Sequence, residues 1–213
     1  MIKKYNDLES YINVLGHTKK CPAIIKNYAN KMPAYSKWNL QYLSNTFDNI
    51  DLTYEDYEHS SDIIKTKTKR TTFKNYTKII DKNSVYLAQI NILKTCNKLA
   101  DDVEIPGYIN KLPQVSLYYG PKNIGTKLHY DYGDNIYCNL RGRKEFILID
   151  PDQHIKTKKN KDWKHFACDT IDCKLFKNDC ITLCPGDSLF IPKGYWHEVK
   201  NITKSLGLSI MYN

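Results

Sequence analysis

The stretch Pro185-Gly-Asp-Ser-Leu-Phe-Ile-Pro-Lys-Gly-Tyr-Trp-His-Glu-Val199 decides the fold that we expect for this chain. The apolar run Ser188–Ile191 leads into the turn Pro192-Lys-Gly194, and the chain then resumes with Trp196 and His197. Short apolar runs bounded by proline and glycine are typical of antiparallel strands joined by tight turns. The stretch therefore predicts a strand, a turn and a second extended segment that carries a histidine.

The same pattern of short strands extends over the second half of the chain. We expect strands at Gln114–Tyr119, Asn135–Leu140, Glu145–Ile149, Cys180–Leu183, Ser188–Ile191 and Ser205–Met211. Many short strands separated by turn residues indicate a β-sandwich or a β-barrel. The first half predicts helices at Asp7–Gly16, Asn39–Phe47 and Ile92–Ala100, and strands at Pro22–Lys26 and Val85–Ile90. Without a linker or internal repeat, we expect one domain over residues 1–213, with mainly helical support in 1–112 and a β core in 113–213.

The charge of the chain favours acidic partners without demanding them. The 213 residues carry a formal net charge of +9, and the segment Lys65–Lys82 concentrates basic residues around two aromatic ones. A solvated loop followed by an amphipathic helix at Thr72–Ile80 is the favoured interpretation of this segment, and a nucleic-acid-binding stripe is the alternative. A second basic loop is expected at Gln153–Asp169.

Cysteines and hydropathy bear on the compartment. Seven cysteines in a chain without an apolar leader predict free thiols in a reducing environment. The spacing of Cys168, Cys173, Cys180 and Cys184 does not match paired zinc knuckles, so we expect buried thiols there. No apolar run approaches the ~20 residues that cross a bilayer. We therefore expect an intracellular protein, cytoplasmic or nuclear, without a membrane partner.

Two histidines and one carboxylate suggest a metal centre. In Thr126-Lys-Leu-His-Tyr-Asp131, His129 and Asp131 are two residues apart and face the same side of an extended segment. Together with His197 they form the ligand set of non-haem Fe(II) oxygenases, which leaves coordination positions open for a 2-oxo acid and O2. A chance His-x-Asp pair is the alternative for the first motif alone. The second motif favours the metal site.

Lys144 follows the turn Arg141-Gly-Arg143 and is a candidate for binding the co-substrate. If Asn135–Asn139 and the segment after the turn Arg141-Gly-Arg143 are successive antiparallel strands, Lys144 returns to the cavity that holds the metal. A buried lysine needs an anionic partner, and the distal carboxylate of 2-oxoglutarate would supply one. A surface lysine at the start of a strand is the alternative.

These residues carry a family resemblance. The segment Leu117–Asp131 resembles the metal-binding region of cupin-like JmjC oxygenases, a group that includes factor inhibiting HIF, the JmjC lysyl and arginyl hydroxylases and the tRNA wybutosine hydroxylase. Pro185–Val199 is similar to their second motif almost position by position, and Val85–Gln89 resembles an upstream landmark. The likeness covers most of the chain, from about residue 22 to the end, although the helical first third carries little of it.

The resemblance implies a mostly β protein with helices, in which a double-stranded β-helix (jelly-roll, cupin) carries an N-terminal helical layer. It implies Fe(II) held by His129, Asp131 and His197. It also implies 2-oxoglutarate held by Lys144, Thr126 and Tyr86, with Asn135 beside the cofactor. For Tyr86, a core aromatic is the alternative. Met211 stands where several relatives carry asparagine, which leaves cofactor contacts from the last strand open.

The resemblance further implies a dioxygenase that hydroxylates a C–H bond of a protein side chain with O2, releasing succinate and CO2. A tRNA-base hydroxylase is one alternative, because Asp131–Asn135 and Leu206–Ser209 resemble the tRNA enzyme and the basic stretches suit RNA. A histone N-methyl-lysine demethylase is another. A non-catalytic cupin that only binds a ligand is the alternative from a different class. Tyr132, Tyr195 and Trp196 are candidates for the substrate mouth, with core packing the favoured interpretation for Trp196. Glu198 is expected to be structural or to support a metal ligand, and the oligomeric state stays open.

Overall fold

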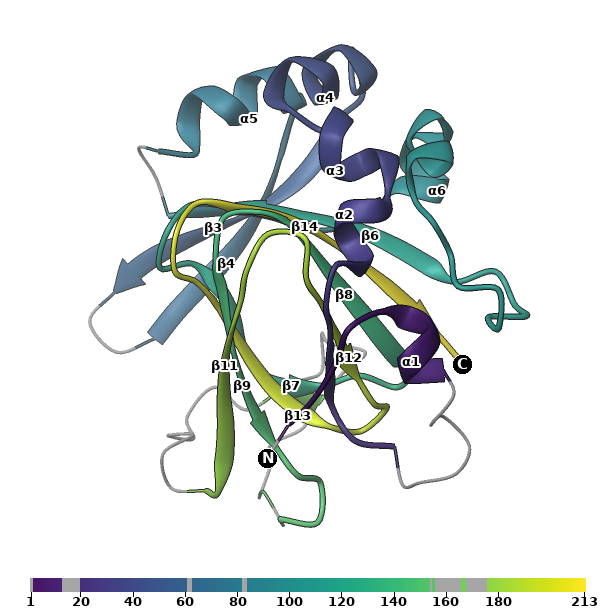
Figure 1. The fold of residues 1–213 in the computed structure, drawn as a ribbon. Helices are drawn as coiled ribbons and strands as arrows, with labels where there is room; N and C mark the ends of the chain where they lie inside the picture. The colour runs from purple at the N-terminus through teal and green to yellow at the C-terminus, as the bar shows by residue number, and fades with distance from the viewer. Residues whose placement is uncertain are drawn as a thin grey trace.

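The protein is described by a computed structural model that covers residues 2–12, 20–60, 63–81, 84–153, 155, 166–167 and 176–213, without the side chains of 58–60, 63–66 and 166–167. Its strands form two sheets, and a group of helices covers the outer side of the larger one (Figure 1). The double-stranded β-helix with helices, as implied by the sequence, is confirmed.

The large sheet has nine strands in the order β1-β2-β12-β8-β14-β6-β5-β3-β4. Their bounds in chain order are β1 Lys3–Tyr5, β2 Ala23–Ile25, β3 Leu52–Ser60, β4 Ile63–Thr71, β5 Val85–Asn91, β6 Gln114–Gly120, β8 Asp134–Arg141, β12 Ser188–Ile191 and β14 Ser205–Tyr212. The small sheet has five strands in the order β10-β7-β13-β9-β11. These are β7 Gly125–Tyr130, β9 Lys144–Ile149, β10 Phe166–Ala167, β11 Asn178–Leu183 and β13 Trp196–Asn201.

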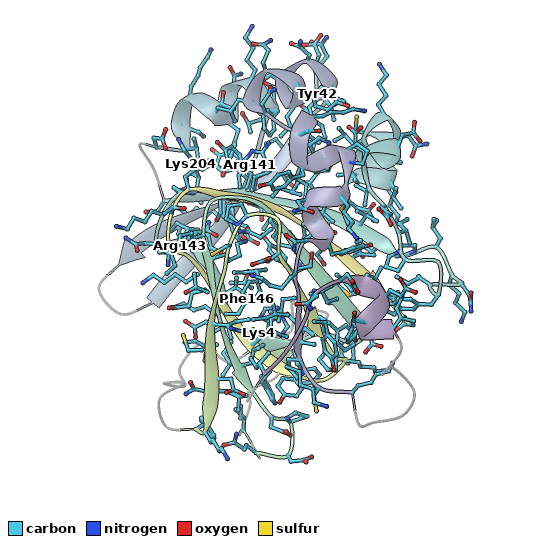
Figure 2. The ribbon with its side chains drawn as sticks, in the orientation of Figure 1. Lys4, Tyr42, Arg141, Arg143, Phe146 and Lys204 are labelled. Atoms are coloured by element: carbon cyan, nitrogen blue, oxygen red, sulfur yellow. The ribbon has the colours of Figure 1, made fainter. Side chains whose placement is uncertain are left out.

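The helices are short, and all of them precede β6 in the chain. They are α1 Leu8–Ile12, α2 Tyr28–Lys31, α3 Pro33–Lys37, α4 Leu40–Thr46, α5 Phe73–Ile79, α6 Ile92–Thr95 and the 3-10 helix η1 Asn97–Asp102. Asn39 caps α4 by accepting a hydrogen bond from the Tyr42 N–H, and Thr72 caps α5 through the Asn75 N–H. Figure 2 shows Tyr42 in this helical layer and Phe146 between the two sheets.

Alternation along the central strands of the large sheet separates two interiors. On β8, Ile136, Cys138 and Leu140 belong to the core shared with the helices, whereas Tyr137 belongs to the core between the sheets. On β14, Leu206, Leu208 and Ile210 likewise face the helices. Because successive side chains point to opposite faces of a strand, the inner face of β14 carries Ser205, Gly207 and Ser209 before Met211 near the end of the strand. These small side chains leave space for a cavity between the sheets.

Most of the predicted elements are confirmed. The strands predicted after residue 113 correspond to β6, β8, β9, β11, β12 and β14, and the predicted helix at Asn39–Phe47 corresponds to α4. The helix predicted at Asp7–Gly16 begins as α1, with Ser10 N–H donating to Asp7, and its second half lies outside the described residues. The helix predicted at Ile92–Ala100 is divided at Cys96 into α6 and η1.

Three expectations need correction. The loop predicted at the start of Lys65–Lys82 is wrong, because this segment is the strand β4, paired with β3 over its whole length. Residues 1–112, expected to be mainly helical, also supply five strands to the large sheet. Cys180 and Cys184 are exposed, so the expectation of buried thiols is wrong for them. Cys168, Cys173 and most of the second basic loop lie outside the described residues, although Phe166–Ala167 form β10.

Candidate active site

The two histidines come from neighbouring antiparallel strands of the small sheet. His129 on β7 and His197 on β13 are direct cross-strand partners, and their ring centroids are 4.1 Å apart. Both side chains are buried, with 6 % and 3 % of their surfaces exposed. The register of one strand pair therefore brings together two residues that are 68 positions apart in the sequence.

Backbone carbonyls orient both imidazole rings. His129 Nδ1 lies 2.7 Å from the carbonyl oxygen of Lys127, and His197 Nδ1 lies 2.9 Å from that of Tyr195. Because a carbonyl oxygen only accepts hydrogen bonds, each Nδ1 carries the proton and donates it. The Nε2 atom of each ring is then the nitrogen that can bind a metal, which is the usual arrangement in metal sites.

Asp131 completes the group from the turn between β7 and β8. Its carbonyl oxygen accepts a hydrogen bond of 2.9 Å from the N–H of Gly194, whose φ of 78° lies in the left-handed region that favours glycine. The turn that precedes His197 is thereby fixed to the segment that carries Asp131. One donor atom from each of His129, Asp131 and His197 lies within 4.8 Å of the other two. The three predicted ligands are thus brought together.

Asn135 and Ser209 support the Asp131 carboxylate. Asn135 Nδ2 donates to Asp131 Oδ2 at 3.4 Å, and Ser209 Oγ donates to Asn135 Oδ1 at 2.7 Å. The chain of hydrogen bonds runs from β14 through β8 to the turn. The last strand therefore contributes to the site through Ser209, two residues before Met211.

Lys144 is buried between the two sheets, with 1 % of its surface exposed, and the alternative of a surface lysine is excluded. Its Nζ donates to Tyr86 Oη at 3.1 Å and lies 4.6 Å from the ring centroid of Tyr137 and 5.6 Å from those of Tyr86 and Tyr118. These contacts with aromatic faces compensate only part of the cost of removing an ammonium group from water. Desolvation by burial lowers the pKa of Lys144 to about 7.

A single cavity joins the metal-ligand group to Lys144. It is lined by Tyr86, Gln89, Tyr118, Thr126, His129, Asp131, Asn135, Tyr137, Lys144, Phe146, Ile191, His197, Val199 and Ser209. All seven residues predicted for the site line it. Sequence reasoning missed Tyr118, Tyr137 and Ser209. Of these, only Tyr137 shares a strand face with a predicted site residue, because it follows Asn135 on β8 by two positions.

Gln89 reaches this cavity through an irregular strand. The pairing of β5 with β6 shifts register between Leu87 and Ile90, and Gln89 has a φ of 54°. Bulges of this kind re-aim a side chain and are frequent beside active sites. The sequence motif Val85–Gln89 gives no signal for the bulge itself.

The remaining aromatic candidates have separate surroundings. Tyr132 is 45 % exposed, and Trp196 is buried with its ring 4.8 Å from that of Tyr130, so the structural expectation for Trp196 is confirmed. Tyr195 is partly buried and donates a long hydrogen bond of 3.5 Å to Asp150. Tyr132 and Tyr195 do not line the cavity that contains the metal-ligand group.

One family model covers most of the chain. The model of a family described as "Cupin-like domain" matches residues 17–213. The chain belongs to the cupin-like JmjC family. This family consists of Fe(II)- and 2-oxoglutarate-dependent oxygenases that use O2, and the His-Asp-His group of this chain agrees with that chemistry.

Several curated proteins are similar to most of this chain. The chain is 30 % identical to JmjC domain-containing protein D of Dictyostelium discoideum over 88 % of its length, covering 50 % of that protein. It is 29 % identical to lysine-specific demethylase JMJ30 of Arabidopsis thaliana over 90 % of its length, again covering 50 %. Lysine-specific demethylase 8 of Danio rerio is 24 % identical, with coverage of 91 % and 53 %. The chain thus spans about half the length of these relatives. Within the described residues, no helix is long and apolar enough to cross a membrane.

The site fits the cofactors of the family on its own chemistry. Two oriented Nε2 atoms and one carboxylate oxygen form the neutral-nitrogen and oxygen donor set that non-haem Fe(II) prefers. At the other end of the cavity, Lys144 forms no ion pair with a carboxylate among the described residues. A buried ammonium without an acidic neighbour suits the distal carboxylate of 2-oxoglutarate.

Proposed function

We propose that this chain is a dioxygenase that hydroxylates a C–H bond of a protein side chain. The observation that supports it best is the single cavity lined by both the His129, Asp131 and His197 group and Lys144. The two parts are separated along β9, where Lys144 pairs with Asn201 and Leu148 pairs with His197. One part suits a metal and the other suits an anion, which is the arrangement that a chelating 2-oxo acid with a distal carboxylate requires. We keep residues 1–213 as a single domain within this proposal.

The residues of the chain have distinct roles in this proposal. His129 and His197 bind the ion through Nε2 because their Nδ1 atoms are hydrogen-bonded to backbone carbonyls. Asp131 supplies the negative charge, and Asn135 holds its carboxylate through the 3.4 Å contact. The chemistry that bound Fe(II) supplies is the coupling of 2-oxoglutarate decarboxylation to oxidation of a C–H bond by O2.

The co-substrate end is assigned to Lys144, Thr126 and Tyr86. Lys144 pairs with the distal carboxylate, and Tyr86 holds the ammonium in place through the 3.1 Å hydrogen bond. Thr126 lies on β7 and lines the same cavity, so its hydroxyl is a further donor for the carboxylate. The low dielectric of a buried site strengthens each of these interactions.

Turnover of 2-oxoglutarate tests the proposal. The purified chain should convert 2-oxoglutarate to succinate, measured by NMR, only when Fe(II), O2 and a cell extract that contains the substrate are present. His129→Ala and His197→Ala should each abolish succinate formation, because two ligands hold iron poorly. The matched control is Asp48→Ala, which removes an exposed carboxylate outside the site. Succinate formation that persists in both histidine variants would contradict the proposal, and no succinate under any condition would favour a binding module.

Demethylation of N-methyl-lysine is the second candidate, because two of the relatives are named lysine-specific demethylases. The two outcomes differ in their products. A hydroxylase adds the mass of one oxygen atom to a peptide, whereas a demethylase removes a methyl group from lysine and releases formaldehyde. Mass spectrometry of extract proteins and of digested RNA, after incubation with the wild-type chain or His129→Ala, separates both from an RNA hydroxylase, which would modify nucleosides only.

A further inference from the structure

Tyr137 carries a buried hydroxyl that the fold does not satisfy. The residue lies in the middle of β8 on the face towards the cavity, and 5 % of its surface is exposed. Its Oη has no hydrogen-bond partner among the described residues. A buried polar group without a partner costs about 1–3 kcal/mol, so native proteins rarely keep one without a reason.

Packing explains the ring but not the hydroxyl. The Tyr137 ring packs against Phe146 at a centroid distance of 5.2 Å and belongs to the apolar core between the sheets. A phenylalanine would make the same contact without burying an oxygen. The neighbouring strand β14 leaves room for the hydroxyl because residue 207 is a glycine. A Cβ at this position would overlap Tyr137 Oη. The oxygen of Tyr137 therefore needs an explanation outside the core.

The surroundings of Tyr137 indicate an anion. Its ring is the nearest of the three aromatic rings to Lys144 Nζ, at 4.6 Å, and Tyr86 Oη lies on the same ammonium group at 3.1 Å. The Tyr86 hydroxyl, the Tyr137 ring and the Lys144 ammonium thus lie together in one part of the cavity. Burial raises the pKa of Tyr137 well above its usual value, so the hydroxyl stays protonated and can donate.

Another buried hydroxyl serves as a reference. Tyr11 Oη also lacks a partner among the described residues, but Tyr11 packs with Tyr5 and Phe190 on the far side of the large sheet and does not line the cavity. An unsatisfied hydroxyl alone is therefore not a sign of a ligand in this protein. The position of Tyr137 beside Lys144, inside the cavity, distinguishes the two.

We propose that Tyr137 Oη donates a hydrogen bond to the distal carboxylate of 2-oxoglutarate and so helps the site to select a dicarboxylate. This inference rests on the proposed function, because it requires 2-oxoglutarate to occupy the cavity. Tyr137 was not among the residues that the sequence predicted for the co-substrate. Lys144 provides the positive charge that attracts the carboxylate, and the Tyr137 hydroxyl provides a directional hydrogen bond that orients it.

Calorimetry with Tyr137→Phe tests the assignment. The full chain is loaded with Mn²⁺, which occupies the site without turnover, and titrated with 2-oxoglutarate and with 2-oxopentanoate, which has the same chain length but no distal carboxylate. Loss of one hydrogen bond to the charged carboxylate should weaken 2-oxoglutarate binding about 10- to 100-fold. The affinity for 2-oxopentanoate should be unchanged.

Thermal unfolding without ligand gives an independent readout. Tyr137→Phe removes an unsatisfied hydroxyl, so the ligand-free variant should melt at or above the temperature of the wild-type protein. Tyr11→Phe is the matched control, with the same stability change and wild-type affinity for both acids. A lower melting temperature would indicate a structural role for the hydroxyl and would overturn the assignment.

The binding outcomes separate this inference from the proposed function. Wild-type affinity of Tyr137→Phe for 2-oxoglutarate would overturn the role of the hydroxyl and leave the proposed function standing. An equal loss of affinity for both acids would also overturn it, because the hydroxyl would then shape the cavity without contacting the carboxylate. A wild-type protein that binds Mn²⁺ but not 2-oxoglutarate would overturn the proposed function and this assignment together.

Discussion

Lys144 makes the protein sensitive to pH in a defined direction. Burial lowers its pKa to about 7, whereas a lysine in the unfolded chain titrates near 10.4. Between about pH 7 and pH 10 the unfolded state thus holds a proton that the folded state lacks, so the free energy of unfolding increases with pH in this window. The groups that face Lys144 are Tyr86, Tyr118 and Tyr137, whose raised pKa values keep them neutral throughout.

We expect Lys144→Met to flatten this dependence. Urea unfolding at about pH 7 and about pH 9 should show a gain in stability for the wild-type protein and a smaller gain for the variant, by on the order of 1–3 kcal/mol. The variant should also lose its preference for 2-oxoglutarate over 2-oxopentanoate. Lys94→Met, which removes an exposed lysine on α6, is the matched control and should behave like the wild-type protein. An identical pH dependence in Lys144→Met would show that another group is responsible.

Substitution of Asn135 should lower the metal affinity of the protein more than its stability. Asn135 contacts Asp131 Oδ2 and in turn accepts from Ser209, so its loss releases the carboxylate from a defined orientation. Groups that orient metal ligands in this way contribute about 10–100-fold to metal affinity. We expect Asn135→Ala to weaken Mn²⁺ binding by that factor, measured by the EPR signal of the free ion. Ser209→Ala should reduce Mn²⁺ affinity less than Asn135→Ala does. A larger loss of Mn²⁺ affinity in Ser209→Ala than in Asn135→Ala would contradict this order.

The pair of strands β7 and β13 determines whether the two histidines meet. A side chain at Gly125 on β7 would overlap the carbonyl oxygen of Val199 on β13, whereas a side chain at Gly107 would have nothing within 4 Å. Gly125→Ala should therefore push the strands apart, lower stability by about 1–3 kcal/mol and weaken Mn²⁺ binding. Gly107→Ala is the control and should leave both unchanged. Full metal affinity in a destabilised Gly125→Ala protein would show that the histidines tolerate displacement of the strands.

The sequence predicts elements best where hydrophobic runs are short and bounded by turns, as in the strands that follow residue 113. It fails for β4, where the charge of Lys-Thr-Lys-Thr-Lys indicates a loop although its period of two fits a strand, and it makes no prediction for β3. This hairpin extends the large sheet at its edge, where solvated lysines are compatible with a strand. The metal ligands were predictable from residue type and spacing. Tyr137 and Ser209 were not, because their role depends on the packing of β8 against β14 and on the inward face of each strand.

The site joins the two sheets of the molecule. The metal-binding histidines and Lys144 belong to the small sheet, whereas Tyr86, Tyr137 and Asn135 belong to the large one. A metal alone should therefore stabilise mainly the small sheet and the turn with Asp131, and the bound co-substrate should connect both sheets. Ligand binding to the folded state adds about 2.7 kcal/mol at 100 times its dissociation constant.

Hydrogen exchange measured by mass spectrometry separates these two steps. With Mn²⁺ alone, we expect slower exchange in β7 and β13; with 2-oxoglutarate added, protection should extend to β5 and β8. Helices α4 and α5, which lie on the outer side of the large sheet (Figure 1), should change least because no ligand contacts them. His129→Ala with both ligands is the control and should show little protection of β7 and β13. Protection that stays confined to the small sheet after 2-oxoglutarate is added would mean that the co-substrate does not contact Tyr86, Tyr137 and Asn135, and the assignment of the cavity would have to change.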